Sequence, residues 1–316
     1  MSSRIAVCSD LIARHPGMRA EVLAAYPQAR LYEGPRMTSE DEVIAFLRDS
    51  DAAIVGFEPI TERVLASLPA LEIISKFGAG CEKIDFHAVK RHKVRFGYQW
   101  GVNRLAVAEL ALCFMIAALR WVMPLNLAMR AGERPRFRNG RLLTGRVVGI
   151  HGCGHIGKEV VRLLAPFGCE LLACDIKDYP DFYHANAVTP VSFETLLARS
   201  EVLTLHLPKT PATEKLYGRD VLARLRPDCV LINTCRGGIV DEAALADRLE
   251  SGQLVAACFD VFAVEPSDND RLLRNPNLLA TPHIGASAEE IRLAMVRAAI
   301  HGLTHHDLVE PAQFYA

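Results

Sequence analysis

Three side chains of this sequence could together carry acid–base chemistry on a carbonyl compound. Arg236 lies in the segment 233–238 (NTCRGG), Glu265 in the segment 260–266 (DVFAVEP) and His283 in the segment 281–285 (TPHIG). A guanidinium can hold a carboxylate and a carbonyl oxygen together with its planar fork. An imidazole paired with a carboxylate favours its protonated form and can donate that proton. Each residue alone would more often be structural, but the three in this order predict a site that protonates a carbonyl while a hydride arrives.

A glycine-rich loop precedes all three residues. It reads Gly152-x-Gly154-x-x-Gly157, follows a predicted strand at 146–150 and opens a predicted helix. The first glycine permits the tight turn, the second lets a pyrophosphate approach the backbone, and the third lets the helix pack on the strand. Asp175 ends the next predicted strand, where an acid accepts hydrogen bonds from ribose hydroxyls and would repel a 2'-phosphate. This pattern predicts an NAD site in preference to an NADP site, although Lys177 weakens that preference; the alternative is a glycine-rich packing turn.

The elements that must position these residues alternate between short apolar runs and helical patterns, which predicts α/β architecture with parallel sheets. The first hundred residues contain predicted strands at 5–8, 52–55 and 73–75. A second series has predicted strands at 146–150, 171–174, 202–205, 230–233, 256–259 and 278–280. Residues 106–119 are apolar nearly all round and predict a buried helix, residues 130–141 predict an extended connection, and a final amphipathic helix is predicted after Gly285.

From these motifs the chain resembles the D-isomer-specific 2-hydroxyacid dehydrogenases, a family of NAD-dependent enzymes. The similarity is densest between residues 103 and 285 and includes the segment 206–213 (HLPKTPAT). The resemblance implies two domains, a Rossmann-type doubly wound parallel sheet and a flavodoxin-like substrate domain. The substrate-binding domain would comprise residues 1–100 and 286–316, and the NAD-binding domain residues 101–285. It also implies a homodimer, for which the segment 121–141 is a candidate arm.

The resemblance implies roles for particular residues. Arg236, Glu265 and His283 would be catalytic, Asp260 would hold the nicotinamide carboxamide, and backbone amides around Ala79 and Gly80 would receive the substrate carboxylate. The full set expected to bind cofactor is Gly152, Gly154, His155, Ile156, Gly157, Asp175, His206, Pro208, Thr213, Thr234, Cys235, Asp260, His283 and Gly285. The set expected to bind substrate is Lys76, Phe77, Gly78, Ala79, Gly80, Asn103, Arg236 and His283.

The substrate itself stays open, because the chain departs from the family near the substrate loop. Residues 81–83 read CEK where many members have Tyr-Asp-Asn or a similar sequence, and residues 104–106 read RLA where phosphoglycerate-type members often have Thr-Arg-Ser. Lys76 could meet a second anionic group of the substrate, or it could be a solvated strand end. The expected function is NAD-dependent reduction of a small 2-oxo acid to the D-2-hydroxy acid, or the reverse. The alternatives are a non-catalytic, NAD-sensing corepressor-like protein and a dehydrogenase of the same fold acting on an unusual acid.

The composition limits which partners the protein could bind and in which cellular compartment we expect it. The formal net charge of −1 argues against nucleic acid or an anionic membrane as a partner. A cluster of arginines at 130, 134, 136, 138 and 141 reads as a solvated loop or a subunit arm. The cysteines number nine, several lie in apolar stretches where a thiol acts as a small hydrophobe, and no Cys-x-x-Cys pair occurs. With no signal-like segment at the start, we expect a cytoplasmic protein without a metal site.

Overall fold

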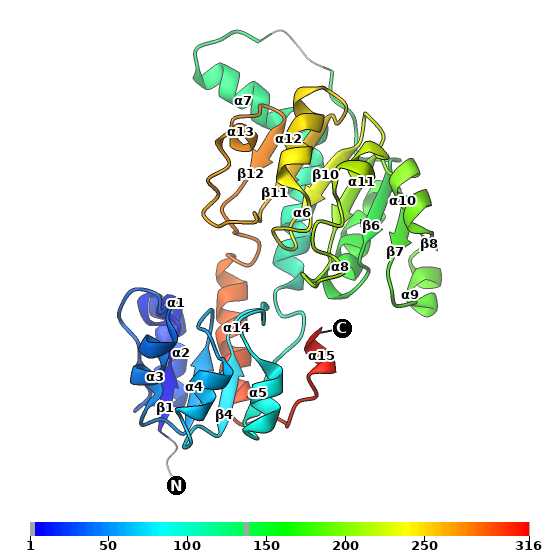
Figure 1. The fold of residues 1–316 in the computed structure, drawn as a ribbon. Coiled ribbons are helices and arrows are strands. Elements are labelled where there is room, and N and C mark those ends of the chain that lie inside the picture. Colours follow the sequence, from blue (N-terminus) through cyan, green and yellow to red (C-terminus); the bar gives the residue numbers. More distant parts are fainter. Residues whose placement is uncertain (1–3, 136–138, 316) are drawn as a thin grey trace. The chain divides into compact units, whose positions relative to one another are not determined.

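The computed structural model of the protein describes residues 4–135 and 139–315 and contains two compact α/β units (Figure 1). Unit 1 comprises Met1–Asn103 and Ser287–Ala316, and unit 2 comprises Arg104–Ala286. Each unit has its own parallel sheet covered by helices. The predicted fold class, with one Rossmann-type sheet and a second, smaller α/β unit, is confirmed.

Unit 1 contains a five-stranded parallel sheet in the order β2-β1-β3-β4-β5. Its strands are β1 (Ile5–Val7), β2 (Arg30–Leu31), β3 (Ala52–Val55), β4 (Ile73–Lys76) and β5 (Arg95–Gly97). This 2-1-3-4-5 order is that of flavodoxin-like sheets, as expected. The sequence did not predict β2 and β5, because they are only two and three residues long and lack a continuous apolar run.

The helices of unit 1 include the segment of chain that follows unit 2. They are α1 (Asp10–Arg14), α2 (Pro16–Ala25), α3 (Glu40–Leu47), α4 (Glu62–Ala66), α5 (Phe86–Arg91), α14 (Glu289–Gly302) and α15 (Ala312–Tyr315). Helix α3 begins with a capping box, in which the Ser39 side chain accepts from the Glu42 amide and the Glu42 carboxylate accepts from the Ser39 amide. The predicted final helix is α14, and it contacts α2, β4 and β5.

Unit 2 contains a seven-stranded parallel sheet in the order β12-β11-β10-β9-β6-β7-β8. The strands are β6 (Val147–His151), β7 (Glu170–Cys174), β8 (Val188–Pro190), β9 (Val202–Leu205), β10 (Val230–Asn233), β11 (Ala256–Phe259) and β12 (Leu278–Ala280). The chain runs from β6 outward in one direction and, from β9 onward, in the other. The carboxyl ends of β6 and β9 therefore flank the point at which such sheets bind their ligands.

Helices cover both faces of this sheet. They are α6 (Arg104–Leu119), α7 (Val122–Arg130), α8 (His155–Leu164), α9 (Pro180–Ala185), α10 (Phe193–Arg199), α11 (Arg219–Ala223), α12 (Glu242–Glu250) and α13 (Asp270–Leu273). The predicted buried helix is α6, which starts two residues earlier than expected and contacts α8, β10 and β11. Arg136 and Arg138 of the predicted connection lie outside the described residues.

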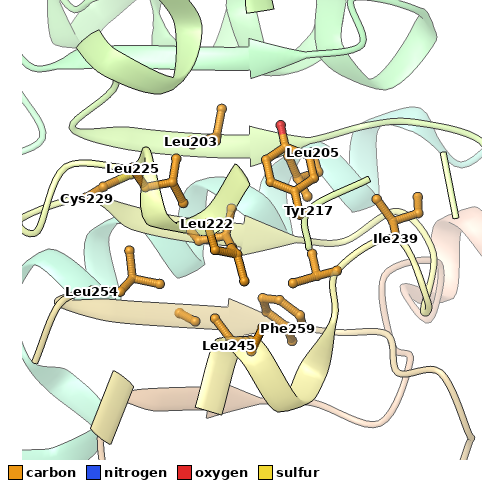
Figure 2. Packing of buried hydrophobic residues seen from close by; sticks show 14 of the residues in the cluster. Leu203, Leu205, Tyr217, Leu222, Leu225, Cys229, Ile239, Leu245, Leu254 and Phe259 are labelled. Carbon is orange, nitrogen blue, oxygen red and sulfur yellow. The ribbon is translucent and has the colours of Figure 1, made fainter. Parts of the chain in front are cut away.

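Two hydrophobic clusters hold the faces of the unit 2 sheet to these helices. On one face, Leu203, Leu205 and Phe259 of the strands meet Leu222 and Leu245 of α11 and α12 (Figure 2). On the other face, Phe114 of α6 and Val160 of α8 belong to one cluster with Ile150 and Ile232. Each fully buried side chain of this size contributes about 1.5–3 kcal/mol. The carboxyl ends of the strands are therefore fixed by a core packed on both sides.

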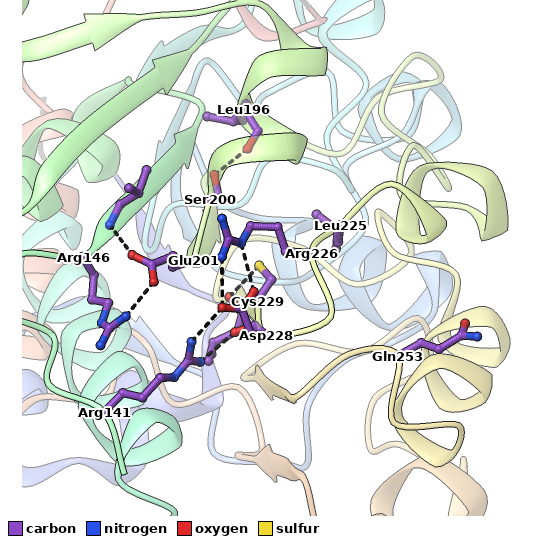
Figure 3. A network of polar contacts seen from close by, with 12 residues as sticks. Arg141, Arg146, Leu196, Ser200, Glu201, Leu225, Arg226, Asp228, Cys229 and Gln253 are labelled. Atoms are coloured by element: carbon purple, nitrogen blue, oxygen red, sulfur yellow. Dashed lines mark hydrogen bonds and ion pairs between the residues drawn. The ribbon is translucent and has the colours of Figure 1, made fainter.

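A polar network ties together residues at the opposite, amino edge of this sheet (Figure 3). Glu201, just before β9, accepts from Arg146 Nη1 at 2.6 Å and from the Val147 amide at 3.0 Å. Asp228, just before β10, accepts from Arg226 Nε at 2.9 Å, and its backbone carbonyl accepts from Arg141 Nη2 at 2.7 Å. These ion pairs and hydrogen bonds fix the amino ends of β6, β9 and β10. The glycine loop lies at the opposite, carboxyl end of β6.

None of the nine cysteines forms a disulfide, and all nine lie within the described residues. Cys113 lies in one of the apolar stretches where we expected a thiol to act as a small buried hydrophobe, and this expectation is wrong because Cys113 is exposed. Across residues 4–135 and 139–315, no group of three or more His, Cys, Asp or Glu side chains is arranged to hold a metal ion. No single helix in those ranges is long and apolar enough to span a membrane; α6 and α7 meet the criteria only as a pair, bent by 67° at the break between them.

Candidate active site

The glycine loop joins β6 to α8, and its three glycines meet different surroundings. Gly152 has a φ of 92°, and a Cβ there would lie 2.5 Å from the carbonyl oxygen of His206. A Cβ at Gly157 would lie 2.2 Å from the carbonyl oxygen of Gly152. A Cβ at Gly154, by contrast, would meet no described atom within 4 Å. The first and third glycines are therefore required by packing, whereas the second leaves open space above the loop.

That open space lies at the N-terminus of α8. The N-cap residue is Gly154, which makes no side-chain capping bond, and the first turn contains no acidic residue. Unsatisfied amides and the helix dipole make such an end attractive to anions. Burial, followed by the charges of Arg104 and Lys158, lowers the pKa of His155. This end of the helix fits a pyrophosphate.

Asp175 follows β7 and is bonded to the glycine loop. Its Oδ2 accepts from the Cys153 amide at 2.5 Å, and its Oδ1 accepts from the Lys177 amide at 2.9 Å. Each carboxylate oxygen can accept a second hydrogen bond. Asp175 therefore fixes the loop and keeps acceptor capacity for ribose hydroxyls.

Two buried polar atoms near the same edge of the sheet have no hydrogen-bond partner among the described residues. They are Nδ1 of His206, directly after β9, and Oγ1 of Thr234, directly after β10. The other ring nitrogen of His206 lies 3.0 Å from Thr204 Oγ1, and burial lowers the pKa of His206 to about 3, so the ring is neutral. Buried polar atoms rarely lack partners. Their presence fits a site where a polar cofactor would supply the missing bonds.

The turn after His206 is held by Thr213. Its hydroxyl donates to the Pro208 carbonyl at 2.6 Å and accepts from the Thr210 amide at 2.8 Å. The two residues expected to line the cofactor groove, Pro208 and Thr213, are thus directly bonded to each other.

Asp260 is fully buried and shapes the loop that carries His283. Its Oδ1 accepts from Thr281 Oγ1 at 2.6 Å and from the Ile284 amide at 2.7 Å, and its Oδ2 accepts from the Gly285 amide at 2.7 Å. The His283 amide also donates to the Asp260 carbonyl at 2.8 Å. The expected contact of Asp260 with nicotinamide stays a prediction, and the bonds in the structure give it the added task of holding this loop.

His283 and Glu265 form a direct pair. Nδ1 of His283 lies 2.7 Å from Oε2 of Glu265, and Oε1 of Glu265 accepts from the Phe262 amide at 3.0 Å. The two side chains are 41% and 38% exposed, so the pair is open to a ligand. Since Glu265 engages Nδ1, Nε2 is the ring nitrogen left to exchange a proton with a substrate.

Arg236 lies in a turn packed against the Glu265 segment. Its Nη1 donates to the Cys235 carbonyl at 2.7 Å, and Asn233 Nδ2 donates to the Arg236 carbonyl at 3.0 Å. A Cβ at Gly237 would lie 1.8 Å from the Phe262 carbonyl oxygen, so only glycine fits there. Arg236, Glu265 and His283 follow β10, β11 and β12, which are neighbours in the sheet. The structure therefore brings all three to one edge of unit 2.

The residues expected to bind substrate outside unit 2 lie in unit 1, at the end of β4, in the loop after it and at Asn103. Lys76 is only 4% exposed, and its ammonium donates to the carbonyls of Gly56 at 2.8 Å and Phe77 at 2.6 Å. It is therefore not a solvated strand end. Gly78 has a φ of 91°, and the Ala79 carbonyl accepts from Tyr98 Oη at 2.8 Å. Phe77 is buried and Asn103 is 9% exposed.

Sequence reasoning missed Thr281 and Tyr98, which hold these loops through side-chain hydroxyls. Thr281 bonds Asp260, 21 residues away, and Tyr98 bonds Ala79, 19 residues away. The position of Thr281 just before Pro282-His283 was visible, but no local pattern signals either partner.

The geometry defines an α/β protein of the dinucleotide-binding class, with a histidine–glutamate pair and an arginine at the carboxyl edge of its sheet. Residues 112–285 match the family model "D-isomer specific 2-hydroxyacid dehydrogenase, NAD binding domain". The chain belongs to this family, as its motifs predicted, and NAD is the cofactor of the domain that it contains.

Relatives and solved structures agree with this assignment. The chain is 35% identical over 266 residues to the D-3-phosphoglycerate dehydrogenase of Mycobacterium leprae, covering 83% of this chain and 50% of that protein. It is 32% identical over 257 residues to the hydroxypyruvate reductase of Thermotoga maritima, covering 79% of this chain and 83% of that protein. The chain thus spans about half the length of the phosphoglycerate dehydrogenases it matches.

Among solved structures, a glyoxylate reductase from Paecilomyes thermophila superposes with a TM-score of 0.84 at 28% identity, covering 96% of this chain and 95% of that one. A 2-hydroxyacid dehydrogenase from Ketogulonicigenium vulgare Y25 superposes with a TM-score of 0.82 at 27% identity, covering 96% and 95%.

Proposed function

We propose that the chain is an NAD-dependent dehydrogenase that interconverts a small 2-oxo acid and the corresponding D-2-hydroxy acid. The observation that carries this proposal is the 2.7 Å pairing of His283 with Glu265 beside the Arg236 turn, at one edge of an NAD-binding sheet. The names of the relatives support the same substrate class, since they include phosphoglycerate dehydrogenases, a hydroxypyruvate reductase and a glyoxylate reductase.

The residues expected to hold the cofactor fit it in three respects: open space above Gly154, the uncapped start of α8, and the unpartnered atoms of His206 and Thr234. The residues that would bind it are Gly152, Gly154, His155, Ile156, Gly157, Asp175, His206, Pro208, Thr213, Thr234, Cys235, Asp260, His283 and Gly285. When bound, the reduced nicotinamide supplies a hydride for C2 of the 2-oxo acid.

His283 acts as the acid in the reducing direction and as the base in the reverse direction. Its Nε2 holds the proton that moves to the carbonyl oxygen as negative charge develops there. Glu265, bonded to Nδ1, fixes the ring orientation and stabilises the imidazolium. A positioned acid of this kind contributes about 10²–10⁴ in rate.

Arg236 binds the substrate carboxylate and the carbonyl oxygen. Its planar fork lets it contact both, and each charge-assisted hydrogen bond contributes about 1.5–3 kcal/mol. The bond from Nη1 to the Cys235 carbonyl orients the guanidinium.

In unit 1 the loop that follows β4 binds the carboxylate end of the substrate through the amides of Ala79 and Gly80. Lys76, Phe77, Gly78 and Asn103 complete this set. We accordingly assign substrate binding to residues 1–100 and 286–316 and NAD binding to residues 101–285.

The test is oxidation of NADH with glyoxylate, hydroxypyruvate, pyruvate and phosphorylated 2-oxo acids. Arg236→Ala and His283→Ala should each lower kcat/KM by about 10²–10⁴, while the NADH affinity of Arg236→Ala stays within a few-fold. His184→Ala, at an exposed histidine of α9, is the matched control and should keep full activity. Undiminished turnover by His283→Ala would refute the acid–base assignment. Tight NADH binding without turnover on the whole panel would instead favour an NAD-sensing protein, and turnover only of an unrelated acid would favour a dehydrogenase with a remodelled pocket.

We also propose a cytoplasmic homodimer that contacts its second copy through the segment 121–141, which includes α7. No residue of α7 is fully buried, and Leu127 and Met129 are 51% and 69% exposed. A monomer by light scattering at micromolar concentration would exclude this dimer.

A further inference from the structure

The chain segment after α14 returns to the sheet of unit 1 and packs along its edge. We call residues 307–314 the return segment. The Phe96 amide donates to the Asp307 carbonyl at 2.8 Å, which pairs the segment with β5. Lys90 of α5 forms an ion pair with Glu310 at 2.7 Å, and Val309 is buried in the hydrophobic core of unit 1. A hydrogen bond, an ion pair and apolar packing therefore hold the segment to unit 1.

The return segment ends at Phe314, which joins an aromatic cluster. The cluster comprises Phe86, Phe96, Tyr98, Trp100 and Phe314. The Phe314 ring stacks on Phe86 at a centroid distance of 3.8 Å and an interplanar angle of 12°. It also lies 5.2 Å from the Trp100 ring at 24° and meets the edge of Phe96 at 5.6 Å. Pairs of this kind contribute about 0.5–1.5 kcal/mol each beyond their burial.

Tyr98 connects this cluster to the substrate loop. Its ring meets Trp100 edge-on at 4.7 Å and lies 6.0 Å from Phe314. Its hydroxyl donates to the Ala79 carbonyl at 2.8 Å. The ring that carries this hydroxyl is thus positioned by the return segment.

The bond to Ala79 fixes the orientation of a whole peptide unit. The Ala79 carbonyl and the Gly80 amide belong to one planar group and point in opposite directions. Glycines flank Ala79 on both sides, at 78 and 80, so the loop's own backbone preferences do little to prevent that unit from rotating. With the carbonyl held by Tyr98, the Gly80 amide is directed away from the aromatic cluster.

We propose that Tyr98 and Phe314 are positioning residues that keep the Gly80 amide available to the substrate carboxylate. Through them, the return segment sets the affinity of the enzyme for its acid substrate. This inference rests on the proposed role of the loop after β4 in substrate binding.

The test compares substitutions that remove one contact each. Tyr98→Phe keeps the ring and removes the hydroxyl, so KM for the 2-oxo acid should rise about five- to tenfold while kcat stays within about twofold and NADH affinity is unchanged. Phe314→Ala should raise KM in the same way. Phe314→Tyr, which keeps an aromatic ring at this position, should have the KM of the wild type.

Two control variants separate positioning from general loss of stability. Tyr32→Phe removes a phenol hydroxyl elsewhere in unit 1, and Phe46→Ala removes a ring that packs on Tyr32 at 5.2 Å. Neither should change KM. An unchanged KM in Tyr98→Phe, or an equal rise in Phe46→Ala, would overturn the proposal.

Hydrogen exchange of the peptide 77–82 supplies a readout that does not depend on turnover. Exchange there should become faster in Tyr98→Phe and Phe314→Ala and stay unchanged in the two controls. If the wild-type protein turns over no acid, the proposed function fails. Hydrogen exchange then decides alone whether Tyr98 and Phe314 hold the loop after β4. Unchanged exchange in both variants would show that these residues do not hold the loop.

Discussion

The two sheets of this protein are built on one plan but begin their first helix with different residues. In each unit the first strand, β1 or β6, lies at the point where the strand order reverses. In unit 2, β6 leads through Gly152 and Gly154 to a helix whose first turn has no acid. In unit 1, α1 begins at Asp10, a carboxylate only 8% exposed in its first turn. One helix start is open to an external anion, and the other already contains one.

Burial shifts the pKa of two histidines in unit 2 and of one carboxyl group in unit 1, in each case toward the neutral form. Burial lowers the pKa of His151 to about 4 and that of His206 to about 3, both in unit 2. In unit 1, burial raises the pKa of Glu58, although amide hydrogen bonds from Gly56 and its own backbone oppose the shift. We therefore expect the stability of the two units to depend on pH in different ways.

The largest expected effect is the loss of unit 2 in mild acid. An unfolded histidine titrates near 6.5, so between pH 6.5 and 4 the unfolded state binds more protons and unit 2 loses stability as the pH falls. The loss is about 3 kcal/mol for each of His151 and His206 by pH 4. Protonation of Glu58 works in the opposite sense in unit 1, where stability falls as the pH rises from 4.5 through the raised pKa.

Hydrogen exchange at a series of pH values can resolve the two units. Peptides of β6, β9 and β10 should lose protection before those of β1, β3 and β4, and His206→Asn should weaken the pH dependence. Earlier loss of unit 1 would contradict the assignment of buried neutral histidines to unit 2.

The next largest effect is expected from adding a side chain at the first glycine of the loop. Gly152→Ala places a Cβ 2.5 Å from a backbone carbonyl at a φ of 92°. The backbone strain alone costs about 1–3 kcal/mol, and the contact adds to it, so thermal unfolding should occur at lower temperature. Gly218→Ala, where φ is −76° and the new Cβ would lie 3.4 Å from the Lys215 carbonyl oxygen, is the control and should unfold like the wild type.

A smaller change gives unit 2 the acid that unit 1 already has. Gly154→Asp introduces a carboxylate where a Cβ meets no described atom within 4 Å, so the protein should fold normally. Repulsion of the pyrophosphate should weaken NADH binding about 30-fold, which corresponds to about 2 kcal/mol. Gly154→Asn has the same shape without the charge. Equal weakening by both substitutions would show that size, not charge, distinguishes the two helix starts.

The smallest expected effect comes from the reverse change in unit 1. Asp10→Asn removes a charge at the start of α1, 3.9 Å from both Arg14 and Arg36. Unit 1 should lose about 0.5–1 kcal/mol in chemical denaturation. NADH binding should not change; a second NADH site in this variant would mean that the acid alone had prevented binding there.

Features that depend on a short local segment are the ones that the sequence predicted. The glycine loop, the strand ends at Asp175 and Asn233, and the family itself are readable because turn residues and apolar runs act within a few positions of the chain. The strands that were missed, β2, β5 and β8, have two or three residues each and too little apolar sequence to be recognised.

Only the tertiary structure decided which side chains meet. The pairing of Glu265 with His283 spans 18 residues, and the hold of Asp260 on Gly285 spans 25. The burial of Lys76, whose ammonium donates to the Gly56 carbonyl, and the contact of Phe314 with Phe86 depend on segments brought together by folding. Residue type and local spacing determine which chemistry a side chain can perform. Its partners, its burial and hence its task follow from contacts between distant segments, which leave no periodic signal in the sequence.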